Sequence, residues 1–239
     1  MKRLLTSLHL ALIGFFLAGS AIAQNSEDKI ILEGWGNASK LVPIHLSGFS
    51  GEVDSVLRFD LYVAGFDFVA PDKAIYQVTG KNSGNVEGQL IDLATKRPVF
   101  GKSYSGGSLR TQAHALANDI IYAVTRVPGV ALTKIAFRVD KGNTSEIFVA
   151  DYDGYNATAI TADNSEASLP AWVPGKRQLF YCSRRFGPIQ IFSQDLNTGT
   201  RKVIAAYGGS NYSPAVSPDG RRVAFILTRS GSPDLYVAD

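Results

Sequence analysis

Residues capable of covalent or metal chemistry are few in this sequence. The chain of 239 residues has one cysteine, Cys182, and three histidines. A single cysteine excludes an intramolecular disulfide and a thiolate metal cage. Cys182 follows the apolar residues 179–181, and this context predicts a buried, inert thiol rather than a nucleophile.

The other candidate groups lack the partners that catalysis or metal binding needs. His45 and His114 stand alone, with no second ligand at metal-binding spacing. No G-x-S-x-G elbow occurs, and Gly101-Lys102-Ser103 lacks the upstream glycine of a phosphate loop, so it is typical of a hairpin. We therefore expect no catalytic residue, no metal ligand and no cofactor in this chain.

Asp151, Asp153 and Asn156 form an acidic cluster that could suggest calcium. However, Gly154 comes too early for an EF-hand loop, and no glutamate follows at the twelfth position. The cluster instead predicts a turn whose carboxylates accept hydrogen bonds from backbone amides. Trp172 is expected to pack in a core rather than to form a ligand platform.

The charge balance argues against a nucleic-acid surface. The formal charge is +3, from 24 basic and 21 acidic residues. Lys2 and Arg3 lie in a segment that we expect to be removed, which leaves 22 basic against 21 acidic residues, or +1. Nucleic-acid binding needs clustered excess positive charge, which a nearly neutral chain does not supply.

The first 23 residues have the three parts of a secretory signal peptide. Basic Lys2 and Arg3 precede a mainly apolar run over residues 4–18, and Ala21 and Ala23 flank Ile22 as a small-x-small cleavage site. A transmembrane anchor is the alternative, but the run is short of the roughly 20 residues that span a bilayer. We predict cleavage after Ala23 and an exported chain.

A repeat of 44 residues fills the second half of the sequence. One aromatic column of this repeat holds Phe137, Tyr181 and Phe225, and an acidic column holds Asp151 and Asp195. Each unit contains four short runs typical of strands, which in the first unit cover residues 135–139, 146–150, 157–161 and 168–173. Four strands in roughly 40–45 residues predict one blade of a β-propeller.

The repeat stops inside its third unit, at Asp239. Propellers close with about four to eight blades, so we expect this chain to be a fragment of a longer protein or a truncated reading frame. The predicted organisation is a signal peptide over residues 1–23, an α+β domain over residues 24–130 and a partial all-β propeller over residues 131–239.

The α+β domain is predicted from mixed periodicity. Runs at residues 30–32, 42–46, 74–79, 88–93 and 98–104 are typical of strands. Val53, Leu57 and Leu61 share one helical face, and Ser108 can cap a second helix that ends near Thr125. We expect the two helices to cover one face of a mixed sheet.

Several of these segments together resemble the TolB family, the periplasmic component of the Tol–Pal envelope system of Gram-negative bacteria. The motifs are residues 109–110 with 113–114, residues 134–137, the hexapeptide 151–156, residues 169–172, the corner 217–220 and residues 234–237. The resemblance covers nearly all of the chain after the leader. It implies an N-terminal domain and a propeller of about six blades, of which about two and a half are present.

The resemblance also implies a function. The family is a non-enzymatic adaptor that links the inner-membrane protein TolA to the outer-membrane lipoprotein Pal, for outer-membrane integrity and constriction during cell division. The TolA contact maps to the start of the mature chain: Gln24, Asn25, Ser26, Glu27, Asp28, Ile30, Ile31 and Leu32. The Pal contact maps to loops that lead into the innermost strands, residues 163–168 and 208–213: Asn164, Ser165, Glu166, Ser168, Ser210, Asn211, Tyr212 and Ser213.

Two other interpretations remain open. The repeat could be the propeller of a secreted serine peptidase or other hydrolase whose catalytic domain lies beyond Asp239. It could also belong to a sugar- or quinone-processing propeller enzyme. A downstream α/β-hydrolase pattern would select the first, and ligand-spaced residues converging on the propeller axis would select the second.

Overall fold

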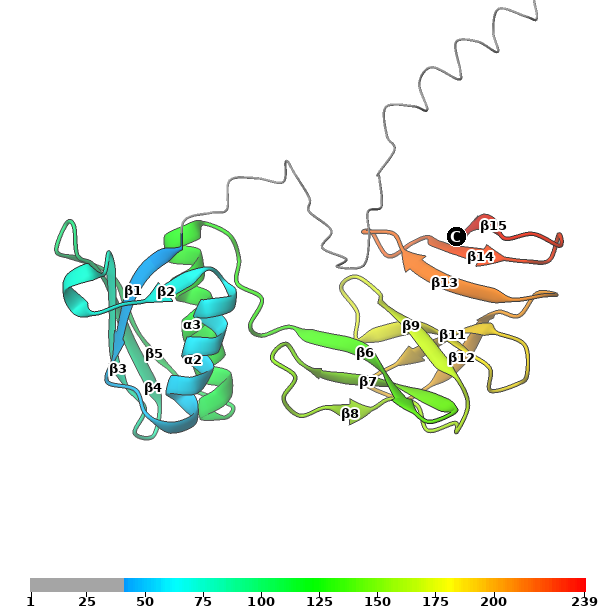
Figure 1. Cartoon of the computed structure of the whole chain (residues 1–239), viewed down its shortest axis with the longest axis horizontal. Coiled ribbons are helices and arrows are strands. Elements are labelled where there is room, and N and C mark those ends of the chain that lie inside the picture. Colours follow the sequence, from blue (N-terminus) through cyan, green and yellow to red (C-terminus); the bar gives the residue numbers. More distant parts are fainter. Residues whose placement is uncertain (1–40) are drawn as a thin grey trace, which may run out of the picture. The chain divides into compact units, whose positions relative to one another are not determined.

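The computed structural model describes residues 41–239. The predicted signal peptide, its cleavage site, the strand at residues 30–32 and the predicted TolA contact residues lie outside the described residues. Figure 1 shows an α/β part followed by a part built of strands only.

The first part contains a five-stranded mixed sheet in the order β2-β1-β3-β4-β5 (Figure 1). β1 (Val42–Ser47) pairs in parallel with β2 (Phe66–Phe68) and β3 (Tyr76–Lys81). β4 (Val86–Asp92) and β5 (Arg97–Tyr104) continue the sheet as antiparallel neighbours. The sequence predicts all of these strands except β2, because a strand of three residues is too short to show an alternation of apolar and polar side chains.

Two helices cover one face of this sheet, as predicted (Figure 1). α2 (Gly51–Val63) and α3 (Leu109–Thr125) contact each other along their lengths. The Ser108 side chain accepts a hydrogen bond from the Thr111 amide and so caps α3, because the first amides of a helix have no partner within it. The helices bury one apolar face against β1, β3 and β4 through Val53, Leu57, Leu61, Ala113, Leu116, Ala117 and Ile120.

The strands of the repeat form three antiparallel sheets. The first contains β6 (Lys134–Lys141), β7 (Thr144–Asp151) and β8 (Thr158–Ala159). The second contains β9 (Ala167–Trp172), β10 (Gln178–Ser183), β11 (Gln190–Asp195) and β12 (Arg201–Ala205). The third contains β13 (Asn211–Val216), β14 (Val223–Leu227) and β15 (Asp234–Ala238).

The structure corrects the predicted grouping of strands into blades. The repeat predicts that β9 is the fourth strand of the first unit, with β6, β7 and β8. Instead, β9 pairs with β10 and is the first strand of the second sheet. A tight turn over residues 173–176 joins β9 to β10, so these two strands form a hairpin, and each structural blade begins one strand earlier than the sequence repeat.

The sheets pack face to face through alternating side chains of the second sheet. Leu179 and Tyr181 of β10 join a buried cluster with Ile147 and Val149 of the first sheet. Cys182, the next residue along β10, joins the opposite cluster, toward the third sheet. Because successive side chains on a strand point to opposite faces, one strand contributes to both interfaces.

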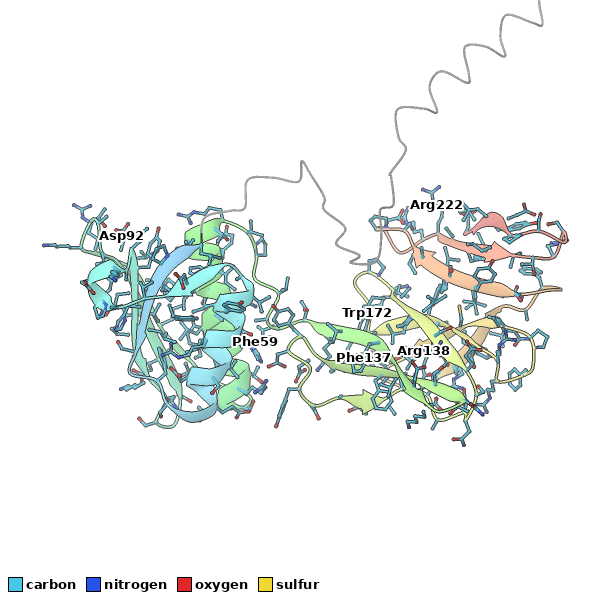
Figure 2. The ribbon with its side chains drawn as sticks, viewed as in Figure 1. Phe59, Asp92, Phe137, Arg138, Trp172 and Arg222 are labelled. Atoms are coloured by element: carbon cyan, nitrogen blue, oxygen red, sulfur yellow. The ribbon has the colours of Figure 1, made fainter. Side chains whose placement is uncertain are left out.

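Aromatic side chains extend these interfaces. Phe137 of β6 stacks on Phe148 of β7, with ring centroids 6.1 Å apart, and Trp172 packs half-buried at the end of β9 (both Phe137 and Trp172 are labelled in Figure 2). Tyr181 and Phe192 stack with centroids 5.8 Å apart. The prediction that Trp172 packs in a blade core is confirmed.

Two turns that contain a proline, at residues 173–176 and 217–220, occupy the same position in the repeat but differ in type. In residues 173–176, Gly175 follows the proline with φ of 70°, and Lys176 N–H donates to the Val173 carbonyl, as in a type II turn. In residues 217–220, glycine comes one position later, and Gly220 N–H donates to the Ser217 carbonyl. The later glycine is the type I pattern.

Candidate functional site

The loops that lead into the first strands of the second and third sheets form one end of the stacked blades. We call them the mouth loops: residues 163–168, which lead into β9, and residues 208–213, which lead into β13. β9 and β13 are the end strands of their sheets and lie next to each other. In a propeller, such strands line the central axis.

A buried carboxylate holds the first mouth loop. Glu146 of β7 is 2% exposed. Its Oε1 accepts the Asn164 amide at 3.0 Å, and its Oε2 accepts the Thr161 hydroxyl. The loop is therefore fixed from beneath by a side chain that solvent does not reach.

Two arginines hold the same loop from its side. The Asp163 carboxylate is 4% exposed and pairs with Arg185 and with Nη1 of Arg201, the latter at 2.6 Å. The next acidic residue, Glu166, is more exposed and accepts from Nε of Arg184 at 2.9 Å. Asp163 therefore faces inward, while Asn164 and part of Glu166 face solvent.

A buried amide holds the second mouth loop. Asn211 is fully buried. Its Oδ1 accepts the Tyr207 amide at 3.0 Å, and its Nδ2 donates to the carbonyls of Tyr207 and Ile189 at 2.9 and 3.2 Å. The resemblance implies that Asn211 contacts the partner. In the structure its side chain is buried and makes its hydrogen bonds inside the protein, so Asn211 positions the loop.

The remaining residues of the second mouth loop differ in exposure. Ser210 is half-buried, and its amide donates to the Thr228 hydroxyl at 2.8 Å. Tyr212 is half-buried and packs against the cluster of Cys182 and Phe225 between the second and third sheets. Truncation of Tyr212 would therefore remove buried packing contacts together with exposed surface. Substitutions at Ser210 and its neighbours test recognition with less effect on stability.

Cys182 is buried, as the sequence predicts, at 1% exposure. Burial raises the pKa of its thiol to about 11, although the amide of Ser213 donates to the sulfur and acts in the opposite direction. A pKa this high leaves little thiolate at neutral pH, and the thiolate is the nucleophilic form.

His114 belongs to a buried polar cluster. Its Nδ1 lies 2.6 Å from Oδ2 of Asp60, across the contact between α3 and α2. Its Nε2 lies 3.6 Å from Oδ2 of Asp153, which also pairs with Arg110. His45 contacts the Val69 carbonyl. Within residues 41–239, no group of three or more histidine, cysteine or acidic side chains is arranged so that it could hold a metal ion.

The acidic hexapeptide forms a turn after β7, as predicted. Asp153 Oδ1 accepts the Tyr155 amide at 3.1 Å. Asp151 instead pairs with the ammonium group of Lys134 on the neighbouring strand. The residues Gly101-Lys102-Ser103 lie within β5, which confirms that they are hairpin sequence.

The helices in the described part of the chain are too short or too polar to cross a membrane.

The three stacked sheets and the 44-residue repeat define a β-propeller protein with an α+β domain before the blades. Comparison with known proteins specifies the kind of propeller. The family model of the TolB beta propeller domain matches residues 122–239.

Curated relatives extend the match into the α+β part. The chain is 32% identical to the Tol-Pal system protein TolB of Actinobacillus pleuropneumoniae serotype 5b over 198 residues, which cover 78% of this chain and 45% of that protein. It is 30% identical to the protein of the same name from Alcanivorax borkumensis, over 78% of this chain and 44% of that protein. A TolB homolog of Chlamydia felis is 35% identical over 54% of this chain and 32% of its own length. The chain thus spans less than half the length of these relatives.

A solved structure agrees on the fold. The crystal structure of TolB from Acinetobacter baumannii matches with a TM-score of 0.76 at 24% identity, over 83% of this chain and 58% of that chain. The repeat region belongs to the TolB β-propeller family, and the chain resembles TolB proteins along both of its parts.

Proposed function

We propose that this protein is a non-enzymatic periplasmic adaptor of a Tol–Pal system, which links the inner-membrane protein TolA to the outer-membrane lipoprotein Pal. In this role it supports outer-membrane integrity and constriction during cell division. The similarity to proteins named as components of the Tol-Pal system supports a role in such a system. The two partners and the division role are inferences from the resemblance.

The construction of the mouth loops is the observation that carries the Pal assignment. Each loop is fixed by a buried side chain, Glu146 beneath the first and Asn211 beneath the second. A loop that is ordered before binding loses less conformational entropy on association, so fixed loops suit recognition. The fixed loops present polar side chains at the surface: Asn164, which is exposed, and Glu166 and Ser210, which are both half-exposed.

The TolA assignment rests on a different part of the chain. The predicted contact residues 24–33 combine a polar start with the β-prone residues Ile30, Ile31 and Leu32. An extended segment of this kind can add as a strand to the edge of a partner's sheet. The domain boundary near residue 130 would leave this segment attached to the α+β domain, away from the mouth loops in sequence.

Replacing Gly208 with arginine tests the Pal site without disturbing the fold. A Cβ at Gly208 would meet no atom within 4 Å, and the φ angle of Gly208 is not positive. An arginine therefore fits the backbone at this position and projects into solvent. We expect Gly208→Arg to weaken Pal binding at least about 10-fold, because a bulky charge now stands in the contact. Titration calorimetry of the protein purified from the periplasm measures the affinity.

Thr198→Arg is the matched control. Thr198 is exposed in the β11–β12 turn, at the opposite end of the second sheet from the mouth loops. This variant should bind Pal as the unmodified protein does. Equal affinity of Gly208→Arg and Thr198→Arg would remove the mouth loops from the Pal site.

A further inference from the structure

The first strands of the second and third sheets share an unusual backbone. Leu169 of β9 and Ser213 of β13 have positive φ angles of 52° and 56°. They are 44 residues apart and so occupy the same position in the repeat. Few residues other than glycine adopt this conformation, and for a bulky residue it is a genuine outlier.

A β-bulge produces this conformation in both strands. Ser168 faces Cys182 in the ladder between β9 and β10, but the next paired residue, Ala171, faces Phe180. Leu169 and Pro170 therefore lie opposite a single residue of β10. The ladder between β13 and β14 shifts in the same way between Tyr212 and Ala215. Bulges of this kind redirect a side chain and are frequent beside functional sites.

The bulge leaves the leucine side chain in solvent. Leu169 is 50% exposed, whereas Ala167 is fully buried and Ser168 and Pro170 are half-buried. Glycine or asparagine would accept the left-handed backbone at lower cost, and the third sheet has the small polar Ser213 here. A leucine at this position adds strain and exposed apolar surface, and neither is needed to form the bulge.

The position of Leu169 offers a functional reason for the backbone strain and for the exposed apolar surface. The residue lies two positions after Ala167, where the first mouth loop enters β9. The loop itself offers polar groups, including exposed Asn164 and half-exposed Glu166. Protein interfaces commonly have an apolar centre surrounded by polar groups.

We propose that Leu169 is the apolar anchor of the mouth, and that the lipoprotein partner places an apolar or aromatic side chain against it. The inference rests on the proposed binding of that partner at the mouth loops. It adds a specificity-determining residue, Leu169, whose side chain is held in place by the bulge. The same position of the repeat is a leucine in the second sheet and a serine, Ser213, in the third.

Two substitutions distinguish the contribution of the Leu169 side chain from that of its backbone conformation. Leu169→Asn keeps a residue that tolerates the left-handed conformation but removes the apolar surface. Leu169→Met keeps an apolar side chain of similar size. We expect the dissociation constant for Pal to rise about 5- to 30-fold in Leu169→Asn and to stay within about 3-fold in Leu169→Met, with the melting temperature of Leu169→Asn unchanged or raised.

Leu132→Asn is the control for loss of an exposed leucine elsewhere. Leu132 is 54% exposed and precedes β6. This variant should leave Pal affinity unchanged. If Leu169→Asn binds as tightly as the unmodified protein, or loses affinity only together with stability, the anchor is wrong while the proposed function stands. If the unmodified protein does not bind Pal, the proposed function fails and this inference fails with it.

Discussion

Deletion of residues 24–33 should abolish binding to TolA and leave the fold intact. Among the described residues, those between 42 and 124 form a continuous apolar core, and we expect this core to hold without the deleted segment. The affinity for the periplasmic part of TolA, measured by titration calorimetry, should fall beyond detection, more than about 100-fold, because all main-chain contacts of an added strand are lost together. The melting temperature checks the fold.

Point substitutions distinguish strand addition from other uses of the same segment. Ile31→Pro removes a backbone N–H, which a strand needs in order to pair with a neighbour. Ile31→Val keeps the donor and the β-branched side chain. If the segment pairs as a strand, only the proline variant loses affinity. Binding by the deletion variant equal to that of the unmodified protein would reject the assignment of TolA to residues 24–33.

Replacement of Glu146 with alanine should destabilise the protein and also weaken Pal binding. Glu146 is buried and accepts hydrogen bonds from the Thr161 hydroxyl and the Asn164 amide. Its removal leaves the buried Thr161 hydroxyl and the Asn164 amide without this acceptor and opens a void, which should lower the free energy of unfolding by about 2–4 kcal/mol. Since Glu146 does not reach the surface, any loss of Pal affinity must come from the released loop.

Asp195→Ala is the matched control for Glu146→Ala. The Asp195 carboxylate also accepts two backbone amides, those of Thr198 and Asn197, which lower the pKa of Asp195. Its turn is exposed and lies away from the mouth loops, so this variant should cost much less stability and leave Pal affinity unchanged. Chemical denaturation and calorimetry on both variants supply the comparison. Full stability or full Pal affinity in Glu146→Ala would contradict the role given to it.

The sequence predicts the elements of this fold well where their periodicity is long. α3 begins after the Ser108 cap and ends at Thr125, as expected, because its apolar face runs through several turns. The 44-residue repeat likewise predicts stacked strands. It does not show which strand opens a blade, because a repeat looks the same from any starting point; only the pairing of β9 with β10 decides that.

The side chains of the mouth were less predictable than its loops. Turn-forming residues mark both loops, but the same residue types serve as surface groups and as supports. Asn211 is buried whereas Asn164 is exposed, and nothing in the local sequence separates them. The support from Glu146 joins residues 18 positions apart, and Arg201 reaches Asp163 across 38 positions. Long-range contacts of this kind depend on the packing of the sheets.

The bulge at Leu169 is a further feature that sequence patterns missed. Alternation of side chains predicts a regular strand over residues 168–173, and a bulge adds one residue to that alternation. The proline after each left-handed residue, Pro170 and Pro214, is the available signal, because proline cannot donate to a ladder. Both prolines belong to the repeat, so their spacing marks the bulge in both blades.

Site-specific photo-crosslinking in cells tests the central claim, recognition of a Pal-type lipoprotein at the mouth, most directly. Tyr207 is 51% exposed beside the second mouth loop, and Tyr155 is 53% exposed in the turn after β7, at the opposite end of the blades. A photoreactive phenylalanine analogue can replace either tyrosine with little change in size. We predict that the probe at position 207 forms an adduct with the lipoprotein and that the probe at position 155 does not. An adduct at position 155 alone, or at neither position while the protein is folded and exported, would contradict recognition at the mouth.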